Sequence, residues 1–506
     1  MNRFFATLAV ACFAFPFAYA EEESKAEDSP KPEKEAPGKG TKPEPVTKTN
    51  QVTIDGVVVE YEVTAASISL PDSKDPAADR AEIFYTSYTV VPGDEAEDRP
   101  IAFCFNGGPG SSSVWLHLGG LGPRRVKLDE AGTGTTLPAP PYGVVDNEFS
   151  ILDVVDLVFI DPVSTGFSRA EEEEKKGSFH GLEGDIESVG AFIHQYCSEH
   201  GRWDSPKFLI GESYGGIRAA GLSEHLQGRY GMYLNGIVLV SALLDFSTIL
   251  FHQGNDLPYL FFLPSYAATA SYHDENNATS PKEAYEAAHQ FAFGDYADAL
   301  LKGNTLDSET RTAIVDKLVE FTGLDAAEIE RADLRPDAFY FRKLLLREQG
   351  KSVGRFDARV IGIDPDKAGN YPDYDASGAA VMGPFSSAMN HYLRDEIGFK
   401  SEAVYEFLTG SVHPWDYKPF TNRYVNVGSR LTDAMTKNPH LKVFVAAGYY
   451  DLATPPAAIE YSLNHLSIDP SLRENIETFY YDGGHMMYTN LEALAKFKAD
   501  LAAFLE

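Results

Sequence analysis

The chain has 506 residues and carries 75 acidic against 43 basic side chains, which gives a formal net charge of −32. Nucleic acids and anionic membrane surfaces would repel such a chain, so neither is expected as a partner. The length allows one large domain with an insertion, or two domains.

Residues 1–20 have the pattern of a signal peptide. A basic start at Arg3 precedes a mostly apolar stretch, and Ala-Tyr-Ala at residues 18–20 supplies a small-x-small cleavage site. We therefore expect a secreted or periplasmic protein that begins at Glu21. A lipid anchor on Cys12 is the alternative. No other segment offers the ~18 uninterrupted apolar residues of a membrane span, so the mature form should contain no integral membrane segment.

Residues 21–50 consist mainly of Glu, Lys, Pro and Gly. Such a composition buries too little apolar surface to offset the entropy of an ordered chain. The segment is predicted to be a disordered, charged, Pro-rich linker.

The next region alternates apolar and polar residues up to position 91, which predicts antiparallel strands. Short apolar runs then alternate with helical stretches such as 186–200 and 219–226. This order is typical of a mostly parallel sheet with helices on both faces. The runs lie at 101–105, 156–160, 208–210, 237–240, 443–446 and 476–481.

The two halves of the predicted sheet are too far apart in the chain for a single crossover. Residues 246–440 are mainly helical in pattern and are predicted to form a large cap insertion. The sheet domain is thus expected in two parts, 51–245 and 441–506. Neither His-Glu-x-x-His nor Cys-x-x-Cys occurs, so no metal and no other cofactor is expected.

Two cysteines, Cys104 and Cys197, remain in the predicted mature chain. Two buried free thiols are favoured, and a disulfide between them stays open.

A candidate nucleophile lies where an apolar strand passes into a helical pattern. Residues 207–216 end in Gly-Glu-Ser-Tyr-Gly-Gly, which places Ser213 in the Gly-x-Ser-x-Gly arrangement of a nucleophile elbow. A sharp turn there exposes the hydroxyl and brings the N–H groups of the following helix close to developing negative charge.

The candidate acid and base follow the cap in the order that this fold requires, which is Ser, acid, His. Asp451 ends a predicted strand, and His485 follows the next strand in a Gly-rich loop. Asp482 is the nearest rival acid. A second Gly-rich loop, Asn-Gly-Gly-Pro-Gly-Ser-Ser-Ser at residues 106–113, directly follows the strand at 101–105. Its glycines allow backbone N–H groups to face an oxyanion.

These motifs together resemble the serine carboxypeptidase family of the α/β-hydrolase superfamily. The family pattern Asn-Gly-Gly-Pro-Gly-Cys-Ser-Ser is matched at 106–113 except at Ser111, and Gly-Glu-Ser-Tyr-(Ala/Gly)-Gly is matched at 211–216. Leu-Gly-Pro at 121–123 and Gly-His-Met at 484–486 add to the likeness. The resemblance covers about residues 90–250 and 442–506, and it predicts an α/β-hydrolase fold.

The resemblance also implies a role for each matched residue. It gives the triad Ser213, Asp451 and His485, an oxyanion hole formed by the N–H groups of Gly108 and Tyr214, and a site for the substrate's terminal carboxylate at Asn106, Gly107 and Glu212. Ionised Glu212 would repel that carboxylate, whereas protonated Glu212 can donate a hydrogen bond. Such an enzyme should bind free C-termini best at acid pH.

Two positions depart from the family pattern. Ser111 stands where the family commonly has Cys, so the usual disulfide is absent there. Gly120 stands where many members have Glu before Leu-Gly-Pro. Loss of this second carboxylate weakens the expectation of family-like acid dependence.

The sequence thus predicts an exported serine carboxypeptidase that acts through an acyl-enzyme on peptides with a free C-terminus. An acyltransferase or esterase with the same triad is the alternative, and a non-catalytic binding protein on this fold is a third hypothesis. The sequence leaves a homodimer open.

Overall fold

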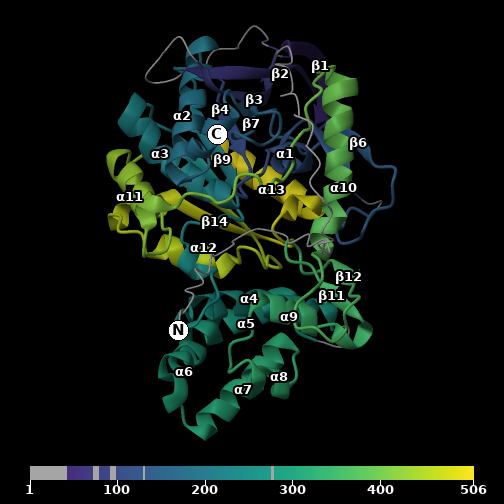
Figure 1. Ribbon diagram of the computed structural model, residues 1–506, viewed down its shortest axis with the longest axis vertical. Coiled ribbons are helices and arrows are strands. Elements are labelled where there is room, and N and C mark those ends of the chain that lie inside the picture. The colour runs from purple at the N-terminus through teal and green to yellow at the C-terminus, as the bar shows by residue number, and fades with distance from the viewer. Residues whose placement is uncertain (1–42, 72–78, 92–98, 129–130, 275–277) are drawn as a thin grey trace, which may run out of the picture.

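The computed structural model describes residues 43–71, 79–91, 99–128, 131–274 and 278–506. The predicted signal peptide, with Cys12, and residues 21–42 of the predicted linker lie outside the described residues. Figure 1 shows two lobes: a larger one built around a sheet, and a smaller helical one formed by the middle of the chain.

A ten-stranded sheet forms the centre of the larger lobe, in the order β1-β2-β3-β7-β4-β9-β10-β13-β14, with β8 paired to β3 beside this path. Neighbouring strands from β7 to β14 are parallel, whereas β1, β2, β3 and β7 pair antiparallel. The predicted sheet type is confirmed. The strands are β1 Val46–Ile54, β2 Val57–Pro71, β3 Asp79–Val90, β4 Ile101–Phe105, β7 Asp156–Ile160, β8 Arg169–Ala170, β9 Lys207–Glu212, β10 Gly236–Val240, β13 Lys442–Gly448 and β14 Ile476–Tyr481.

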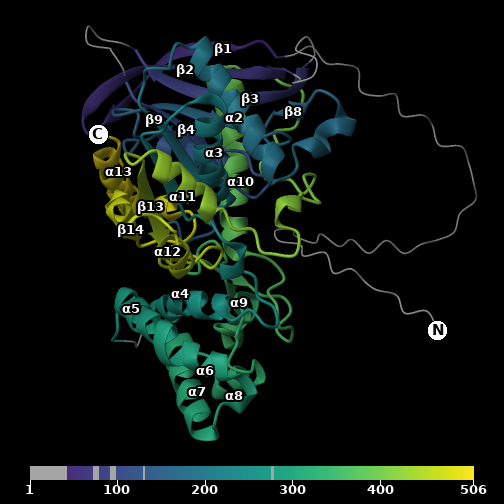
Figure 2. The ribbon, with the colours of Figure 1, turned by 90° about the vertical axis from the view of Figure 1, so that its left-hand side faces the viewer.

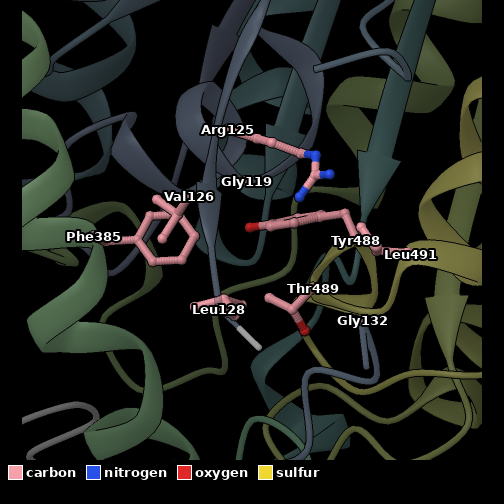
Figure 3. Close-up of a pocket in the computed structure, with 9 residues that line it drawn as sticks. All are labelled: Gly119, Arg125, Val126, Leu128, Gly132, Phe385, Tyr488, Thr489 and Leu491. Carbon is pink, nitrogen blue, oxygen red and sulfur yellow. The ribbon is translucent and has the colours of Figure 1, made fainter. Parts of the chain in front are cut away.

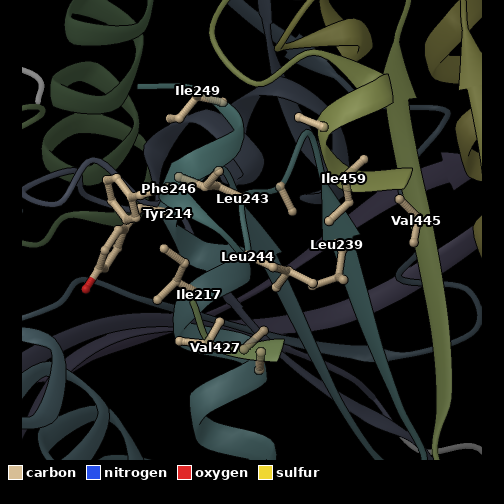
Figure 4. Packing of buried hydrophobic residues seen from close by; sticks show 14 of the residues in the cluster. Tyr214, Ile217, Leu239, Leu243, Leu244, Phe246, Ile249, Val427, Val445 and Ile459 are labelled. Atoms are coloured by element: carbon tan, nitrogen blue, oxygen red, sulfur yellow. The ribbon is translucent and has the colours of Figure 1, made fainter. Parts of the chain in front are cut away.

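Helices cover both faces of this sheet, and the central strands β4, β7, β9 and β10 are buried along their whole length. Phe103 and Phe105 of β4 join the core on one face, while Ala102 and Cys104 join the core on the other. The first core is covered by α2 Leu182–Glu199, α3 Tyr214–Tyr230, α11 Gly428–Lys437 and α12 Pro456–Asn464, and the second by α1 Val114–Leu116, α10 Ala376–His391 and α13 Leu491–Leu505. Figure 4 shows part of the first core, where Ile217 of α3 lies with Leu239 and Val445 of the sheet.

The first strand begins earlier than the sequence indicates. β1 starts at Val46, inside the segment 21–50 that composition predicts to be a linker. Its first half is mostly exposed and polar, so nothing in its composition signals burial. Backbone pairing with β2, from Val46 opposite Ala65 to Ile54 opposite Val57, holds it in the sheet instead.

The smaller lobe is built on α4 Leu257–His273, whose side chains are buried on nearly all sides. None of the helices in the described ranges is long and apolar enough to cross a membrane. The Phe261 ring of α4 packs on Tyr461 of α12, with 4.8 Å between ring centroids, and so joins the two lobes. The lobe also contains α5 Pro281–Phe291, α6 Ala297–Lys302, α7 Ser308–Thr322, α8 Ala326–Arg331, α9 Ala338–Leu344 and the hairpin β11 Lys351–Val353 with β12 Ile361–Ile363.

The predicted cap segment 246–440 is divided between the two lobes. Its first part forms the smaller lobe, and α10 then runs upward along the sheet lobe, as Figures 1 and 2 show. Phe385, Ala388 and Met389 of α10 lie in the second core. A small hairpin, β5 Arg124–Lys127 with β6 Gly143–Asp146, lies against this helix. Cys104 and Cys197 are both free and buried.

A buried ion pair joins two of the helices that cover the first core. Nε of Arg218 on α3 donates to Oδ2 of Asp185 on α2 at 2.8 Å, and both side chains are almost completely buried. Arg218 also donates to the backbone carbonyl of Asn106 at 2.6 Å. The pair therefore connects the helix layer to the Gly-rich loop that follows β4.

We expect Asp185→Ala to lower the free energy of unfolding by about 3–5 kcal/mol, because it leaves the Arg218 guanidinium buried without its counter-charge. Urea unfolding followed by circular dichroism measures this change. Asp433→Ala is the matched control, since it breaks an exposed ion pair with Lys437 on α11 and should have a far smaller effect. Similar losses of unfolding free energy in the two variants would show that the buried ion pair does not stabilise the fold as proposed.

Candidate active site

Ser213 occupies a strained turn between β9 and α3. Its backbone angles are φ 61° and ψ −124°, a region that residues other than glycine rarely adopt. Two hydrogen bonds hold the turn: the Ser213 N–H donates to the Val240 carbonyl at 3.0 Å, and the Leu243 N–H donates to the Ser213 carbonyl at 3.2 Å. Ser213 is partly exposed although both its neighbours are buried, so the turn presents it outward as an elbow would.

Glycines permit the close backbone contacts around this turn. A Cβ on Gly211 would lie 2.2 Å from the Gly215 carbonyl oxygen. A Cβ on Gly107 would lie 2.4 Å from the Tyr214 nitrogen and 2.7 Å from the Gly215 nitrogen, so the Gly-rich loop is pressed directly against the start of α3. Gly108 follows at φ +101°, a conformation that favours glycine. The structure thus brings the two candidate oxyanion-hole residues, Gly108 and Tyr214, to adjoining segments.

Asp451 and His485 form a buried hydrogen-bonded pair. His485 Nδ1 lies 2.8 Å from Asp451 Oδ2, although 34 residues separate the two positions. The carboxylate also accepts the N–H groups of Ala453 at 2.7 Å and Thr454 at 3.0 Å, and the Thr454 hydroxyl at 3.0 Å. Because Nδ1 is engaged by the carboxylate, Nε2 is the ring nitrogen left for other chemistry.

The charges around His485 act on its pKa in opposite directions. Burial lowers the pKa of this imidazole, and the Arg355 guanidinium acts the same way. The Asp451 carboxylate, its hydrogen bond and the Glu212 carboxylate outweigh both, so the pKa of His485 lies above its usual value. The surroundings of His485 therefore stabilise the imidazolium, which is the form that the ring takes when it accepts a proton as a general base.

The rival acid Asp482 has different surroundings. Its side chain is 73% exposed and lies 3.4 Å from Arg359. Asp451, by contrast, is fully buried. The geometry therefore pairs His485 with Asp451.

Glu212, the residue before Ser213, is a buried carboxyl group that accepts a hydrogen bond from a tyrosine. The Tyr488 hydroxyl donates to its Oε2 at 2.6 Å. Burial raises the pKa of Glu212 most, and Asp451 adds to the rise. His485, Tyr488 and Asn106 oppose it, and the resulting pKa is about 7. This group can therefore change protonation state near neutral pH.

A segment of the predicted cap reaches the loops that carry the acid and the base. The His485 N–H donates to the Phe356 carbonyl at 2.5 Å, and the Gly484 N–H donates to Asp357 at 3.1 Å. The Leu452 N–H, beside Asp451, donates to the Arg355 carbonyl at 3.0 Å. These contacts were not predicted, because no motif in residues 246–440 marks them.

Two side chains that bear on the site also escaped the sequence reasoning. Trp415 donates to the Tyr214 hydroxyl at 3.0 Å and so fixes the side chain that follows the elbow. Thr454 shares the Asp451 carboxylate with His485. Thr454 lies in the turn after Asp451, which local spacing could have suggested, whereas nothing local points to Trp415. Within the described ranges, no group of three or more His, Cys, Asp or Glu side chains is arranged to hold a metal ion.

Comparison with known proteins places these features in a family. The sequence profile of the family described as serine carboxypeptidase matches residues 75–490. Serine carboxypeptidase-like 29 of Arabidopsis thaliana is 27% identical over 174 residues, which cover 32% of this chain and 33% of that protein. Pheromone-processing carboxypeptidase KEX1 of Saccharomyces cerevisiae is 30% identical over 152 residues, which cover 29% of this chain and 19% of that protein. The matched segments thus span a third or less of each relative.

A solved structure extends the likeness to the fold. The crystal structure of KEX1, described as a prohormone-processing carboxypeptidase from Saccharomyces cerevisiae, aligns with a TM-score of 0.52 and 17% identity. The alignment covers 88% of this chain and 91% of that one. The predicted α/β-hydrolase fold is therefore confirmed.

We expect Gly107→Ala to lower the free energy of unfolding by about 1–3 kcal/mol, because its methyl group would collide with backbone atoms of the elbow. Gly143→Ala is the control, since no atom lies within 4 Å of the added carbon there. Urea titration of both variants gives the comparison. Equal stabilities would show that the loop and the elbow are not in contact.

Proposed function

Because the chain belongs to the serine carboxypeptidase family, we propose that it is an exported serine-type carboxypeptidase that removes the C-terminal residue of peptides through an acyl-enzyme. The observation that carries the proposal is the buried hydrogen bond between Asp451 and His485, at the same edge of the sheet as the Ser213 elbow. A Ser, acid and His in this chain order are the triad of an α/β hydrolase.

In the proposed reaction, Ser213 attacks the carbonyl carbon of the last peptide bond while Nε2 of His485 takes the hydroxyl proton. Asp451 holds the ring through Nδ1 and stabilises the imidazolium. His485 then gives the proton to the leaving amino acid, the C–N bond breaks and the acyl group stays on Ser213. Water, activated by the same imidazole, attacks the ester and restores the hydroxyl.

The oxyanion would be held by the N–H groups of Gly108 and Tyr214. Tyr214 is the first residue of α3, so its N–H has no partner within the helix, and the positive end of the helix dipole adds to the attraction. The strained Ser213 backbone supports this role, because the turn fixes the hydroxyl before substrate arrives.

Recognition of the free C-terminus would fall to Asn106, Gly107 and Glu212. An amide and a backbone N–H can donate to a carboxylate at any pH, whereas Glu212 can do so only when protonated. Since the pKa of Glu212 is about 7, its donor form dominates below neutral pH and is lost above it. Affinity for peptides with a free C-terminus should fall accordingly as pH rises.

The first prediction from the proposed function concerns the nucleophile. A fluorophosphonate probe should label wild-type protein at Ser213, and Ser213→Ala should abolish the labelling. His485→Ala should slow it by about 10³-fold or more, because no base remains. His465→Ala, at an exposed histidine, is the control and should leave the rate unchanged. Peptide mass spectrometry locates the label, and rapid labelling of Ser213→Ala would exclude the triad. Absence of labelling in the wild type would favour a non-catalytic binding protein.

The second prediction concerns the substrate. At pH 5, free-acid peptides should be cleaved on the order of 10²-fold faster than their C-terminally amidated forms, because only the former satisfy the buried donors. Glu212→Gln should flatten the pH dependence of kcat/KM while largely sparing ester hydrolysis. Equal rates on amidated peptides would remove the exopeptidase proposal and favour an esterase or acyltransferase with the same triad. That alternative draws support from Gly120, which replaces the second carboxylate.

A further inference from the structure

The structure places Tyr488 against the residue proposed to recognise the substrate's carboxylate. Tyr488 lies three residues after His485, in a short helical turn, η10 Met487–Thr489. Its hydroxyl donates to Glu212 Oε2 at 2.6 Å, and both side chains are buried. No motif in the sequence marks this tyrosine.

Asn106 is a third polar residue that acts on this pair. Its Oδ1 accepts the Leu116 N–H at 3.1 Å, so its amide NH₂ is directed away from that helix. The Asn106 side chain lowers the pKa of both Glu212 and Tyr488. The phenol is thus hydrogen-bonded to the carboxyl group, and the amide acts on the pKa of both partners.

The ring of Tyr488 fills the space beside two consecutive glycines. A Cβ on Gly119 would lie 2.3 Å from Tyr488 Cε2, and one on Gly120 would lie 3.1 Å from Tyr488 Cβ. Gly120 is the position where many members of the family have Glu. A side chain at Gly120 would begin in tight contact with this tyrosine, so the ring uses space that the glycine leaves open.

A cavity of about 20 Å³ lies along the ring on the side of Arg125. Figure 3 shows the Arg125 guanidinium and the Tyr488 ring facing this small space, which is about the size of one water molecule. Burial lowers the pKa of Arg125, and Glu148 raises it. The cavity leaves room for small changes on the ring without displacing the backbone.

We propose that Tyr488 is a positioning residue for C-terminal recognition: its hydroxyl, in place of a second carboxyl group, holds Glu212 and sets the alkaline limit of activity on free-acid peptides. The inference rests on the proposed function and names a residue of that site that the family pattern does not contain.

The direction of the effect follows from the charges around Glu212. A second carboxyl group would raise the pKa of Glu212 by like-charge repulsion, whereas a phenol O–H stabilises the ionised form. The pKa of Tyr488 lies well above its usual value because of burial and the nearby Glu212 charge, so the phenol remains a donor throughout the neutral range. His485 lowers the pKa of Glu212 and Asp451 raises it. Removing the Tyr488 hydroxyl takes away one of the groups that lower the pKa of Glu212, so the effect of burial, which raises it, becomes larger.

The test is the pH dependence of Tyr488→Phe. We measure kcat/KM for a free-acid peptide and for a simple ester between pH 5 and pH 9, and take their ratio, which removes the titration of His485. Loss of the donor should raise the pKa of Glu212. The ratio falls as the pH rises, and the midpoint of this fall should therefore move to a higher pH by about one unit. An unchanged midpoint in a folded variant would overturn the proposal.

Two further variants guard against a purely structural effect. Tyr481→Phe is the matched control, because the Tyr481 hydroxyl donates to the Asp500 carboxylate at 2.8 Å away from the site. It should leave the midpoint in place. In a Glu212→Gln background, Tyr488→Phe should no longer shift the ratio. If either variant showed a midpoint shift as large as that of Tyr488→Phe alone, Tyr488 would not act through Glu212 as proposed.

Tyr488→3-fluorotyrosine keeps the ring and covers the case in which the phenylalanine variant does not fold. A more acidic phenol is a stronger donor, so the midpoint should move downward, opposite to the effect of Phe. No movement would count against the proposal. The proposed function fails separately, if wild-type protein shows no preference for free-acid over amidated peptides at any pH.

Discussion

Backbone segments at the carboxyl end of the sheet approach one another at distances that leave no room for a Cβ atom, and the candidate site depends on these contacts. Gly107 meets the nitrogen of Tyr214, a Cβ on Gly448 would lie 2.1 Å from the Gly484 carbonyl oxygen, and one on Gly484 would lie 2.1 Å from the Phe356 carbonyl oxygen. Backbone packed this closely has little freedom to move. The Gly-rich loop is thereby fixed against the elbow, and the loop of His485 is fixed against the end of β13 and against Phe356.

Within that frame, two buried carboxyl groups differ because their partners differ. Asp451 accepts hydrogen bonds from two backbone N–H groups, the Thr454 hydroxyl and the His485 ring. Burial raises the pKa of Glu212 to about 7, although the carboxyl group accepts a hydrogen bond from the Tyr488 phenol. Environments that separate two carboxyl groups in this way assign them separate tasks. One orients the base, and the other is suited to meet a ligand whose recognition depends on pH.

Sequence patterns predicted the parts of this arrangement that are local. Buried strands appear as apolar runs, and the elbow at Ser213 combines a strand, a glycine turn and a helix within ten residues, so both were visible in the sequence. The order of Asp451 and His485 placed them at neighbouring strand ends. The early start of β1 was hidden because backbone hydrogen bonds, which any residue can make, hold its polar half. Tyr488 and Phe356 were hidden because their roles arise from contacts with residues more than a hundred positions away.

The same long-range contacts make the inserted segment part of the site. The Arg355 and Phe356 carbonyls accept N–H groups from the turn of Asp451 and from His485 itself, and Asp357 accepts the Gly484 N–H. These residues lie between β11 and β12, at the junction with the smaller lobe. If that junction moved away from the sheet, all three hydrogen bonds would break and buried backbone groups would be left without partners, which is costly. Motion of the smaller lobe must therefore either spare residues 355–357 or carry the acid and the base with them. The geometry of the acid and base is thus set by the insertion as well as by the sheet.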